Sequence, residues 1–171
     1  MTIRKAEKTD IPEMLRVTAA AKQLMRSRGN YEQWNAEYPG ESVWSEDINN
    51  GNAYVVLNEG RIVCAFAFIF GEDPTYAYIE DGRWPDNEPY ATLHRVASDG
   101  SVHGIIKTIV DYCSLRTARL RADTHEINFV MKKALENSGF ARCGIIYLAD
   151  GAPRVAYFKK CGELKEPEDQ Q

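Results

Sequence analysis

A short turn between a strand and a helix is the part of this sequence that points most directly to a chemistry. It runs Asp99-Gly-Ser-Val-His-Gly-Ile-Ile106 and has glycines at Gly100 and Gly104. Successive backbone N–H groups at a helix start form a cradle for phosphate, and glycine permits unusual dihedrals and close approach. We therefore expect a ligand with two phosphates held by backbone. The alternative is an ordinary turn whose glycines serve geometry only.

A second unit follows this turn and favours the ligand-binding interpretation. Residues 119–122 read as a strand, and a helix over 126–137 ends at Ser138-Gly139. Binding residues gather at the carboxyl ends of strands in α/β folds, which is where Asp123 and His125 fall. Those two side chains either contact a substrate or only organise the turn, and both interpretations stay open.

Composition describes an ordinary globular protein. The 171 residues are 44% hydrophobic and 27% charged, which suits one domain with a sizeable core. We place that domain at 1–162 and expect the polar, acidic tail at 163–171 to be disordered. The formal charge of -4 argues against a nucleic-acid binder, which would need a basic face.

Location and metal content are predicted from what the sequence lacks. The N-terminus has no apolar signal core, and the longest apolar run, 64–70, is too short to span a bilayer. We therefore expect a cytoplasmic protein without a membrane partner. The cysteines form no CxxC pair and the histidines lack ligand spacing, so neither a disulfide framework nor a metal site is expected.

Hydrophobic periodicity supplies the elements that must position these residues. A first strand is expected near residue 3, and a helix from Ile11 to Gly29. Further strands are predicted at 53–57, 61–70, 90–97, 119–122, 143–148 and 155–158, and further helices at 45–49, 102–113 and 126–137. The order combines a hairpin half with a βαβ half. It predicts an α/β fold in which helices cover both faces of a central mixed sheet.

The two motifs resemble those of the GCN5-related N-acetyltransferase (GNAT) family. The family's cofactor loop follows Gln/Arg-x-x-Gly-x-Gly/Ala, and here Gly104 keeps the central glycine while Ser101 and Ile106 depart from the pattern. The family's next motif, an Asn at the start of a helix that ends in Gly-Phe, matches Asn128 and Gly139-Phe140. In element order the resemblance covers nearly the whole chain.

The resemblance implies a GNAT-like fold with a mostly antiparallel mixed sheet. It also implies acetyl-CoA as the cofactor and direct acetyl transfer to a primary amine. In the family, the strand before the loop splays from its parallel neighbour, and its free backbone binds the pantetheine arm. The cofactor residues implied here are Val96, Ala97, Ser101, Val102, His103, Gly104, Ile105, Ile106 and Asn128.

Catalysis requires a base, because an alkyl amine with a pKa near about 10 must lose a proton before it attacks. His94 is the preferred base: it lies on the cofactor strand, on the face we assign to Tyr90, Thr92 and Val96. Glu80 is a second candidate base. For either residue the alternative is a structural or solvated side chain.

The family's usual general acid is a tyrosine on the helix before Gly-Phe, and Leu135 stands at that position here. Tyr147 is the candidate substitute and Tyr157 another, although both also suit core packing. A thiol with a pKa near about 8.5 can also leave without an acid.

The acceptor is expected to be a small-molecule or protein amine. Trp34, in an aromatic segment over 31–44 that is either a cover or part of the pocket, is assigned to substrate binding with Asp123 and His125. A non-catalytic acyl-CoA sensor of the same fold and an unrelated nucleotide-binding module are the alternatives. The sequence does not specify the acceptor, the acyl length, the general acid or the oligomeric state, and a homodimer stays open.

Overall fold

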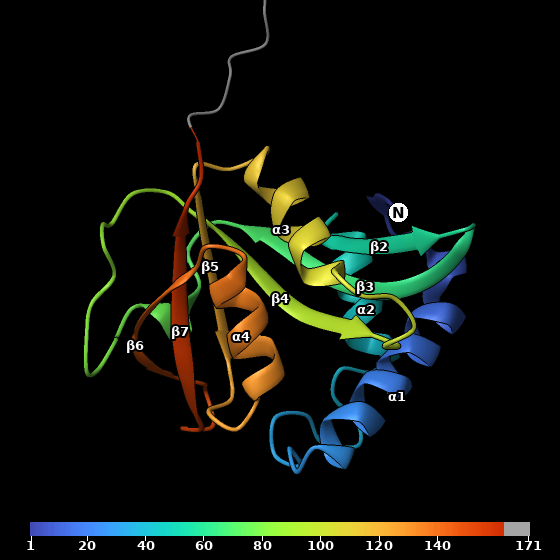
Figure 1. Cartoon of the computed structure of the whole chain (residues 1–171), viewed down its shortest axis with the longest axis horizontal. Helices are drawn as coiled ribbons and strands as arrows, with labels where there is room; N and C mark the ends of the chain where they lie inside the picture. Colours follow the sequence, from blue (N-terminus) through green and yellow to red (C-terminus); the bar gives the residue numbers. More distant parts are fainter. Residues whose placement is uncertain (163–171) are drawn as a thin grey trace, which may run out of the picture.

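Seven strands form one sheet in the order β1-β2-β3-β4-β5-β7-β6 (Figure 1). The computed structural model describes residues 1–162, so the predicted disordered tail lies outside the described residues. The strands are β1 (Thr2–Lys5), β2 (Ala53–Asn58), β3 (Arg61–Phe70), β4 (Ala91–Ser98), β5 (Arg119–Thr124), β6 (Ala141–Tyr147) and β7 (Pro153–Lys160). All paired strands are antiparallel except β4 and β5, which are parallel. The predicted mixed, mostly antiparallel sheet is confirmed.

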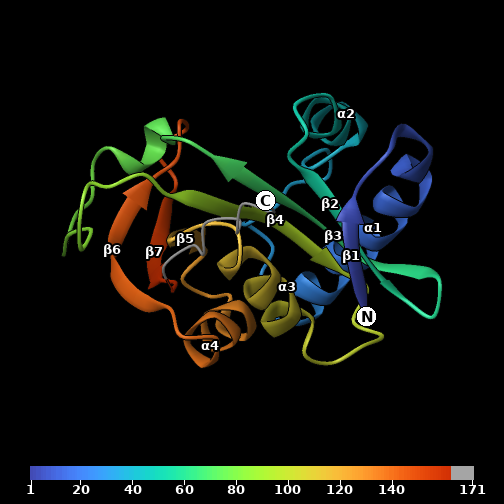
Figure 2. The same cartoon turned by 90° about the horizontal axis from the view of Figure 1, so that it is seen from above.

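Helices cover both faces of this sheet, as Figure 2 shows from above. The helices α1 (Ile11–Ser27) and α2 (Glu41–Asn49) lie on one face, and α3 (Ile105–Ser114) and α4 (Phe129–Asn137) lie on the other. Each pair covers its own apolar core, because each helix presents one apolar stripe to the sheet. No helix within residues 1–162 is both long and apolar enough to cross a membrane.

Local chemistry explains where the observed helices differ from the predicted ranges. The helix predicted from residue 102 begins at Ile105, because Gly104 before it is left-handed, with φ at 79°. The helix predicted from residue 126 begins at Phe129, because the Asn128 side chain accepts a hydrogen bond from the Met131 N–H and caps the first turn. Periodicity alone cannot locate such caps.

The parallel strands β4 and β5 stay together for only a short distance. Their pairing runs from Ala91 and Leu120 to Leu93 and Ala122. Beyond Leu93 the strands diverge, which Figure 1 shows as a widening gap between their ribbons. The side of β4 that faces this gap therefore has backbone groups without a strand neighbour, as the family resemblance implied.

Candidate active site

A cavity of about 710 Å³ lies where β4 and β5 diverge. Leu93 and Ala122 line it from the core beneath α3 and α4. His94 and Asp123 also line it, and they contact Tyr76 in the separate cluster on the opposite face of the sheet. The volume suits a small-molecule or cofactor site. Because residues of both faces line one cavity, ligands approaching from the two faces can meet between the strands.

His94 lies among polar side chains at this opening. Its Nε2 is 2.9 Å from Asp73 Oδ2, and its Nδ1 is 3.7 Å from Asp123 Oδ1. The Tyr76 hydroxyl donates to the same Asp123 oxygen at 2.6 Å, and the Tyr76 ring centroid is 5.9 Å from that of His94. Each ring nitrogen of His94 therefore faces a carboxylate.

The charge states of this cluster follow from burial and hydrogen bonding. Burial alone would raise the pKa of Asp73, but hydrogen bonds from His94 and Thr75 outweigh it and lower that pKa to about 2. Asp73 is therefore ionised at neutral pH, and the His94 Nε2 facing it carries a hydrogen. This leaves Nδ1 as the nitrogen that can take up a proton. Burial and the nearby charge of Asp123 raise the pKa of Tyr76, so its phenol stays protonated and donates.

Aromatic packing holds the segment that carries Asp73. The Asp73 backbone N–H donates to the Tyr90 hydroxyl at 2.8 Å. The Arg121 guanidinium lies 3.9 Å from the Tyr90 ring centroid and 4.0 Å from that of Trp84. Cation–π contacts of this kind stabilise by about 0.5–2 kcal/mol each. Arg121 thus connects β5 to the segment that orients the His94 partner.

A bulge directly after His94 changes the side-chain alternation of β4. Arg95 is left-handed, with φ at 53°, and the register between β3 and β4 shifts at this point. Asp47 of α2 holds Arg95 through two hydrogen bonds of 2.8 Å. Val96 consequently packs into the core under α3 and α4. The prediction that His94 and Val96 share a face is therefore wrong, because it assumed a regular strand.

The cofactor loop offers backbone donors over a shorter stretch than predicted. The N–H groups of Asp99, Gly100 and Ser101 donate to Val63 O, Ser98 Oγ and Asp99 Oδ1. The N–H groups of residues 102–106 have no such partner within the described chain. Gly104 has open space where a side chain would begin. The backbone N–H groups free to bind a phosphate are therefore those of residues 102–106, and the phosphate cradle itself stays a prediction.

Solved structures of acetyltransferases share the fold of this chain. A GNAT-family acetyltransferase from Streptococcus agalactiae is 31% identical, with 95% of this chain and 96% of that chain covered and a TM-score of 0.88. The chain belongs to the GNAT family. It is an acyltransferase, and its resemblance to the family is confirmed.

More distant GNAT structures support the fold alone. A ribosomal-protein-alanine N-acetyltransferase from Brucella melitensis is 20% identical over 94% of this chain and 99% of that chain, with a TM-score of 0.59. AAC(6')-Ib, solved with ribostamycin and coenzyme A, is 15% identical over 93% of this chain and 92% of that chain, with a TM-score of 0.62. No protein-family model and no curated protein matches the sequence.

Most of the residues predicted for the GNAT cofactor line the cavity. Those that do are Val96, Val102, His103, Gly104, Ile105, Ile106 and Asn128. Ala97 does not, because its side chain is fully buried against the core under α1 and α2. Ser101 lies outside the lining as well, since both its N–H and its hydroxyl bind Asp99. A backbone contact from Ala97 stays a prediction.

Asn128 also connects the cavity wall to the aromatic segment after α1. Its amide donates to Gln33 Oε1 at 2.8 Å while its oxygen caps α4. Gln33, Trp34 and Tyr38 all line the cavity. The segment over 31–44 therefore forms part of the pocket wall, although the binding role predicted for Trp34 stays a prediction.

The other predicted catalytic residues lie together but outside the cavity lining. The Tyr147 hydroxyl donates to the Glu80 carboxylate, and the Glu80 backbone bridges to Ile145 of β6 with two hydrogen bonds of 2.8 Å. Both residues help to fix the 71–90 segment to the sheet. We therefore leave Glu80 and Tyr147 out of the proposed mechanism.

His125 also lies outside the cavity lining. Its Nε2 is 3.5 Å from Glu32, and its Nδ1 accepts the Ile127 N–H at 3.3 Å. Burial and the nearby charge of Arg154 lower the pKa of His125. These contacts organise the turn before α4, which was the second interpretation open for this residue.

Sequence reasoning missed several side chains that form the site. Asp73 and Tyr76 lie between the strands predicted at 61–70 and 90–97, in a segment for which no helix or strand is predicted. Gln33 lies in the irregular segment between α1 and α2, and Arg154 lies one residue before the strand predicted at 155–158. Asp73-Pro74 is a helix-start signal that pointed to local order, but nothing in the sequence places these residues beside His94.

Proposed function

We propose that this chain transfers an acetyl group from acetyl-CoA to a primary amine by direct transfer. The observation that carries the proposal is the placement of His94 between Asp73 and Asp123 at the opening between β4 and β5. His94, the proposed base, and the loop over residues 102–106 line the same cavity.

The residues at the opening fit acetyl-CoA. The β4 backbone beyond Leu93 has no β5 partner, so it offers the donors and acceptors that a pantetheine arm requires. The N–H groups of 102–106 and the open space at Gly104 suit a pyrophosphate. When bound, acetyl-CoA supplies the acetyl group as a thioester. The similar fold of AAC(6')-Ib, solved with coenzyme A, supports this assignment.

The acceptor amine is placed at Asp123 and His94. An alkyl amine has a pKa near about 10 and arrives as an ammonium ion, which a carboxylate attracts. His94 Nδ1 takes the proton that the amine must lose before it attacks. Asp73 holds the Nε2–H and stabilises the imidazolium that results, as the carboxylate of a catalytic triad does.

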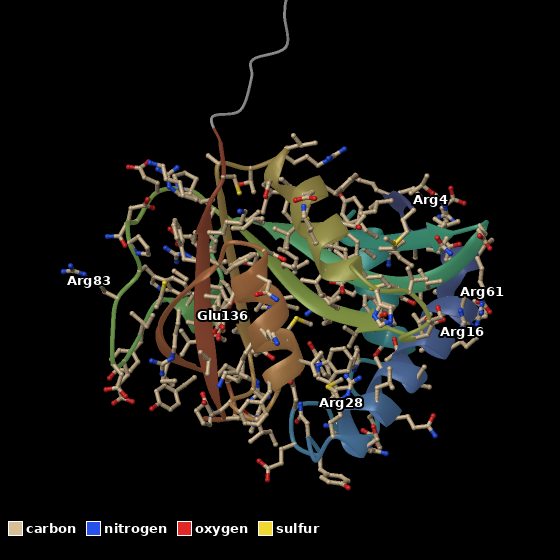
Figure 3. All side chains as sticks on the ribbon, in the orientation of Figure 1. Arg4, Arg16, Arg28, Arg61, Arg83 and Glu136 are labelled. Carbon is tan, nitrogen blue, oxygen red and sulfur yellow. The ribbon has the colours of Figure 1, made fainter. Side chains whose placement is uncertain are left out.

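Neither Tyr147 nor Tyr157, the candidate substitutes for the family's usual general acid, lines this cavity. Leu135 occupies that position and is buried. The Tyr157 hydroxyl donates to Glu136 at 3.0 Å, burial raises the pKa of Tyr157, and Figure 3 shows Glu136 beside β7. A thiol with a pKa near about 8.5 leaves without an acid, so we assign none.

The cysteines favour direct transfer over a covalent enzyme intermediate. Burial raises the pKa of Cys113 to about 12 and raises that of Cys64 further. A thiol with a raised pKa is a poor nucleophile at neutral pH. All four cysteines are free thiols, which fits a reducing compartment and supports our proposal of a cytoplasmic enzyme.

Thiol release from acetyl-CoA tests this function. We expect the purified chain to release coenzyme A faster with some primary amine in a broad panel than without an amine, and to yield the N-acetyl product by mass spectrometry. Binding of acetyl-CoA without amine-dependent release for any panel member would support the sensor alternative instead.

A further inference from the structure

A buried arginine lies in the cavity without an acidic partner. Arg154 on β7 is only 6% exposed and lines the same cavity as His94 and Asp123. Its guanidinium donates to two backbone carbonyls, Pro153 O at 2.9 Å and Gln33 O at 3.4 Å. Within residues 1–162, no carboxylate lies within 4.0 Å of it, so its charge is not balanced by an ion pair.

An unbalanced buried charge is costly, because a guanidinium removed from water needs an anion or full hydrogen bonding to replace it. Carbonyl oxygens occupy two of its five N–H donors, which leaves donors for a ligand. Arg28 and Lys107 also line the cavity but are exposed, so water solvates them. Figure 3 shows Arg28 at the end of α1. Among the cations that line the cavity, Arg154 is therefore the one that is both buried and without a carboxylate partner.

Arg154 lies on the acceptor side of the sheet. Asp123 pairs with Ala156 across β5 and β7, and paired residues share a face. Arg154 is two residues from Ala156, so it shares that face at a distance of about 7 Å along the strand. The acceptor side of the cavity thus has Asp73 and Asp123 around His94 at one end and a guanidinium nearby.

We infer that the acceptor is a small zwitterion, an amine that carries an anionic group such as a carboxylate. Its ammonium binds at Asp123 and His94, and its anionic group binds Arg154. Arg154, His94 and Asp123 line one cavity, so a single small molecule can contact all three side chains. This inference rests on the proposed function and assigns the substrate class of that site.

The charged groups near Arg154 agree with the assignment of an anionic group on the acceptor. Burial lowers the pKa of the adjacent His125, and the positive charge of Arg154 lowers it further. Glu32, the carboxylate near His125, is 77% exposed at its side chain and faces solvent. An anionic group on the acceptor would be recognised by charge-assisted hydrogen bonds, which a planar guanidinium makes with carboxylates in pairs.

Matched acceptors test the inference. Thiol release from acetyl-CoA is measured with the common L-amino acids, with their C-terminal amides, and with aminoalkyl phosphonates and sulfonates. For the best amino acid we expect kcat/KM to exceed that of its amide by about 10- to 100-fold, as the loss of charge-assisted hydrogen bonds implies. An amide that reacts as well as its acid would overturn the inference. A preference for phosphonates or sulfonates would keep the zwitterion and change only the anionic group.

Variants of Arg154 separate recognition from folding. Arg154→Met should bring the acid-to-amide ratio close to one while leaving the rate with the amide similar, and Arg154→Lys should retain part of the ratio. Arg142→Met, a change at an exposed arginine on β6, should leave the ratio as in the wild type. A purely structural Arg154 would lower both rates together and leave the ratio unchanged, which would contradict the inference.

The two levels of the proposal fail differently. If acetyl-CoA raises the melting temperature and only amines without an anionic group are acetylated, the zwitterion is wrong and the proposed transfer stands. If acetyl-CoA neither binds nor releases thiol with any amine, the proposed function itself is wrong.

Discussion

The two ends of the cavity are built differently. On the acceptor side, side chains from distant segments converge: Asp73, Tyr76, His94 and Asp123 contact one another at distances from 2.6 to 3.7 Å. On the cofactor side, the loop over 102–106 offers backbone N–H groups and the open space at Gly104. One end depends on residue identity, and the other depends mainly on backbone conformation.

This difference explains how the loop can depart from the family pattern. Ser101 stands where the family has Gln or Arg, yet its side chain binds Asp99 and lies outside the cavity lining. Ile106 replaces a small residue in the cavity lining, but its backbone N–H still lies in the first turn of α3, where the family resemblance implies that a phosphate binds. Substitutions that keep the backbone can therefore be tolerated on this side, whereas the acceptor side should tolerate few.

Removing the base should produce the largest effect. We expect His94→Gln to lower kcat by about 100- to 10,000-fold, the usual contribution of a general base. The affinity for acetyl-CoA should stay within about twofold, because the cofactor side is made of backbone. Steady-state kinetics and calorimetric titration measure the two quantities.

Glu80→Gln and Tyr147→Phe are the matched controls, since this pair lies outside the cavity lining. Both should keep kcat within about threefold of the wild type. A large loss of kcat in these variants, with His94→Gln nearly active, would move the base to Glu80.

The bulge at Arg95 lies on β4 between His94 and the loop over 102–106. Removing the ion pair between Asp47 and Arg95 that supports this bulge should lower the stability of the protein. Asp47 and Arg95 form a pair whose side chains are 8% and 15% exposed. Asp47→Ala leaves the guanidinium uncompensated, and we expect the free energy of unfolding to fall by about 3–5 kcal/mol in urea denaturation.

The control for this change is the exposed pair of Lys107 and Asp111. Asp111→Ala should alter the free energy of unfolding by less than about 1 kcal/mol. Equal losses in Asp47→Ala and Asp111→Ala would show that the Arg95 bulge does not depend on its buried ion pair.

Two glycines with the same φ test whether the loop over 102–106 binds acetyl-CoA through its backbone. Gly104 and Gly60 both have φ at 79°, and both have open space where a side chain would begin. Alanine at either position adds left-handed strain of about 1–2 kcal/mol. Only Gly104→Ala should also weaken acetyl-CoA binding, by about tenfold, because Gly104 lines the cavity proposed to bind the cofactor and Gly60 does not. A similar loss of affinity in Gly60→Ala would point to general destabilisation.

The smallest expected effect is a pH dependence of stability from Asp73. Its pKa falls from 3.8 to about 2 on folding, so the ionised form is favoured in the native state. The resulting stabilisation is fully present above about pH 4 and is lost as the pH falls towards 2. Asp73→Asn should remove this contribution to the slope of unfolding free energy against pH. An unchanged slope would mean that Asp73 does not carry the shifted pKa.

The sequence predicted the fold better than the side-chain contacts around His94, for a physical reason. Strand and helix periodicity and the position of Gly104 are local signals, and the order of helices and strands along the chain followed from them. The contacts of His94 with Asp73 and Asp123 join residues that are 21 and 29 positions apart (94 − 73 and 123 − 94). The bulge at Arg95 also reversed the expected alternation. Such features depend on tertiary packing that periodicity does not record.

A thermal-shift titration of the wild-type chain with acetyl-CoA, with ADP as the control, tests the central claim most directly. A ligand that binds only the folded state raises the melting temperature by mass action. We predict a clearly larger shift with acetyl-CoA than with ADP, because the opening between β4 and β5 should bind the pantetheine arm as well as the phosphates. No shift with acetyl-CoA, or a shift no larger than that with ADP, would contradict the account.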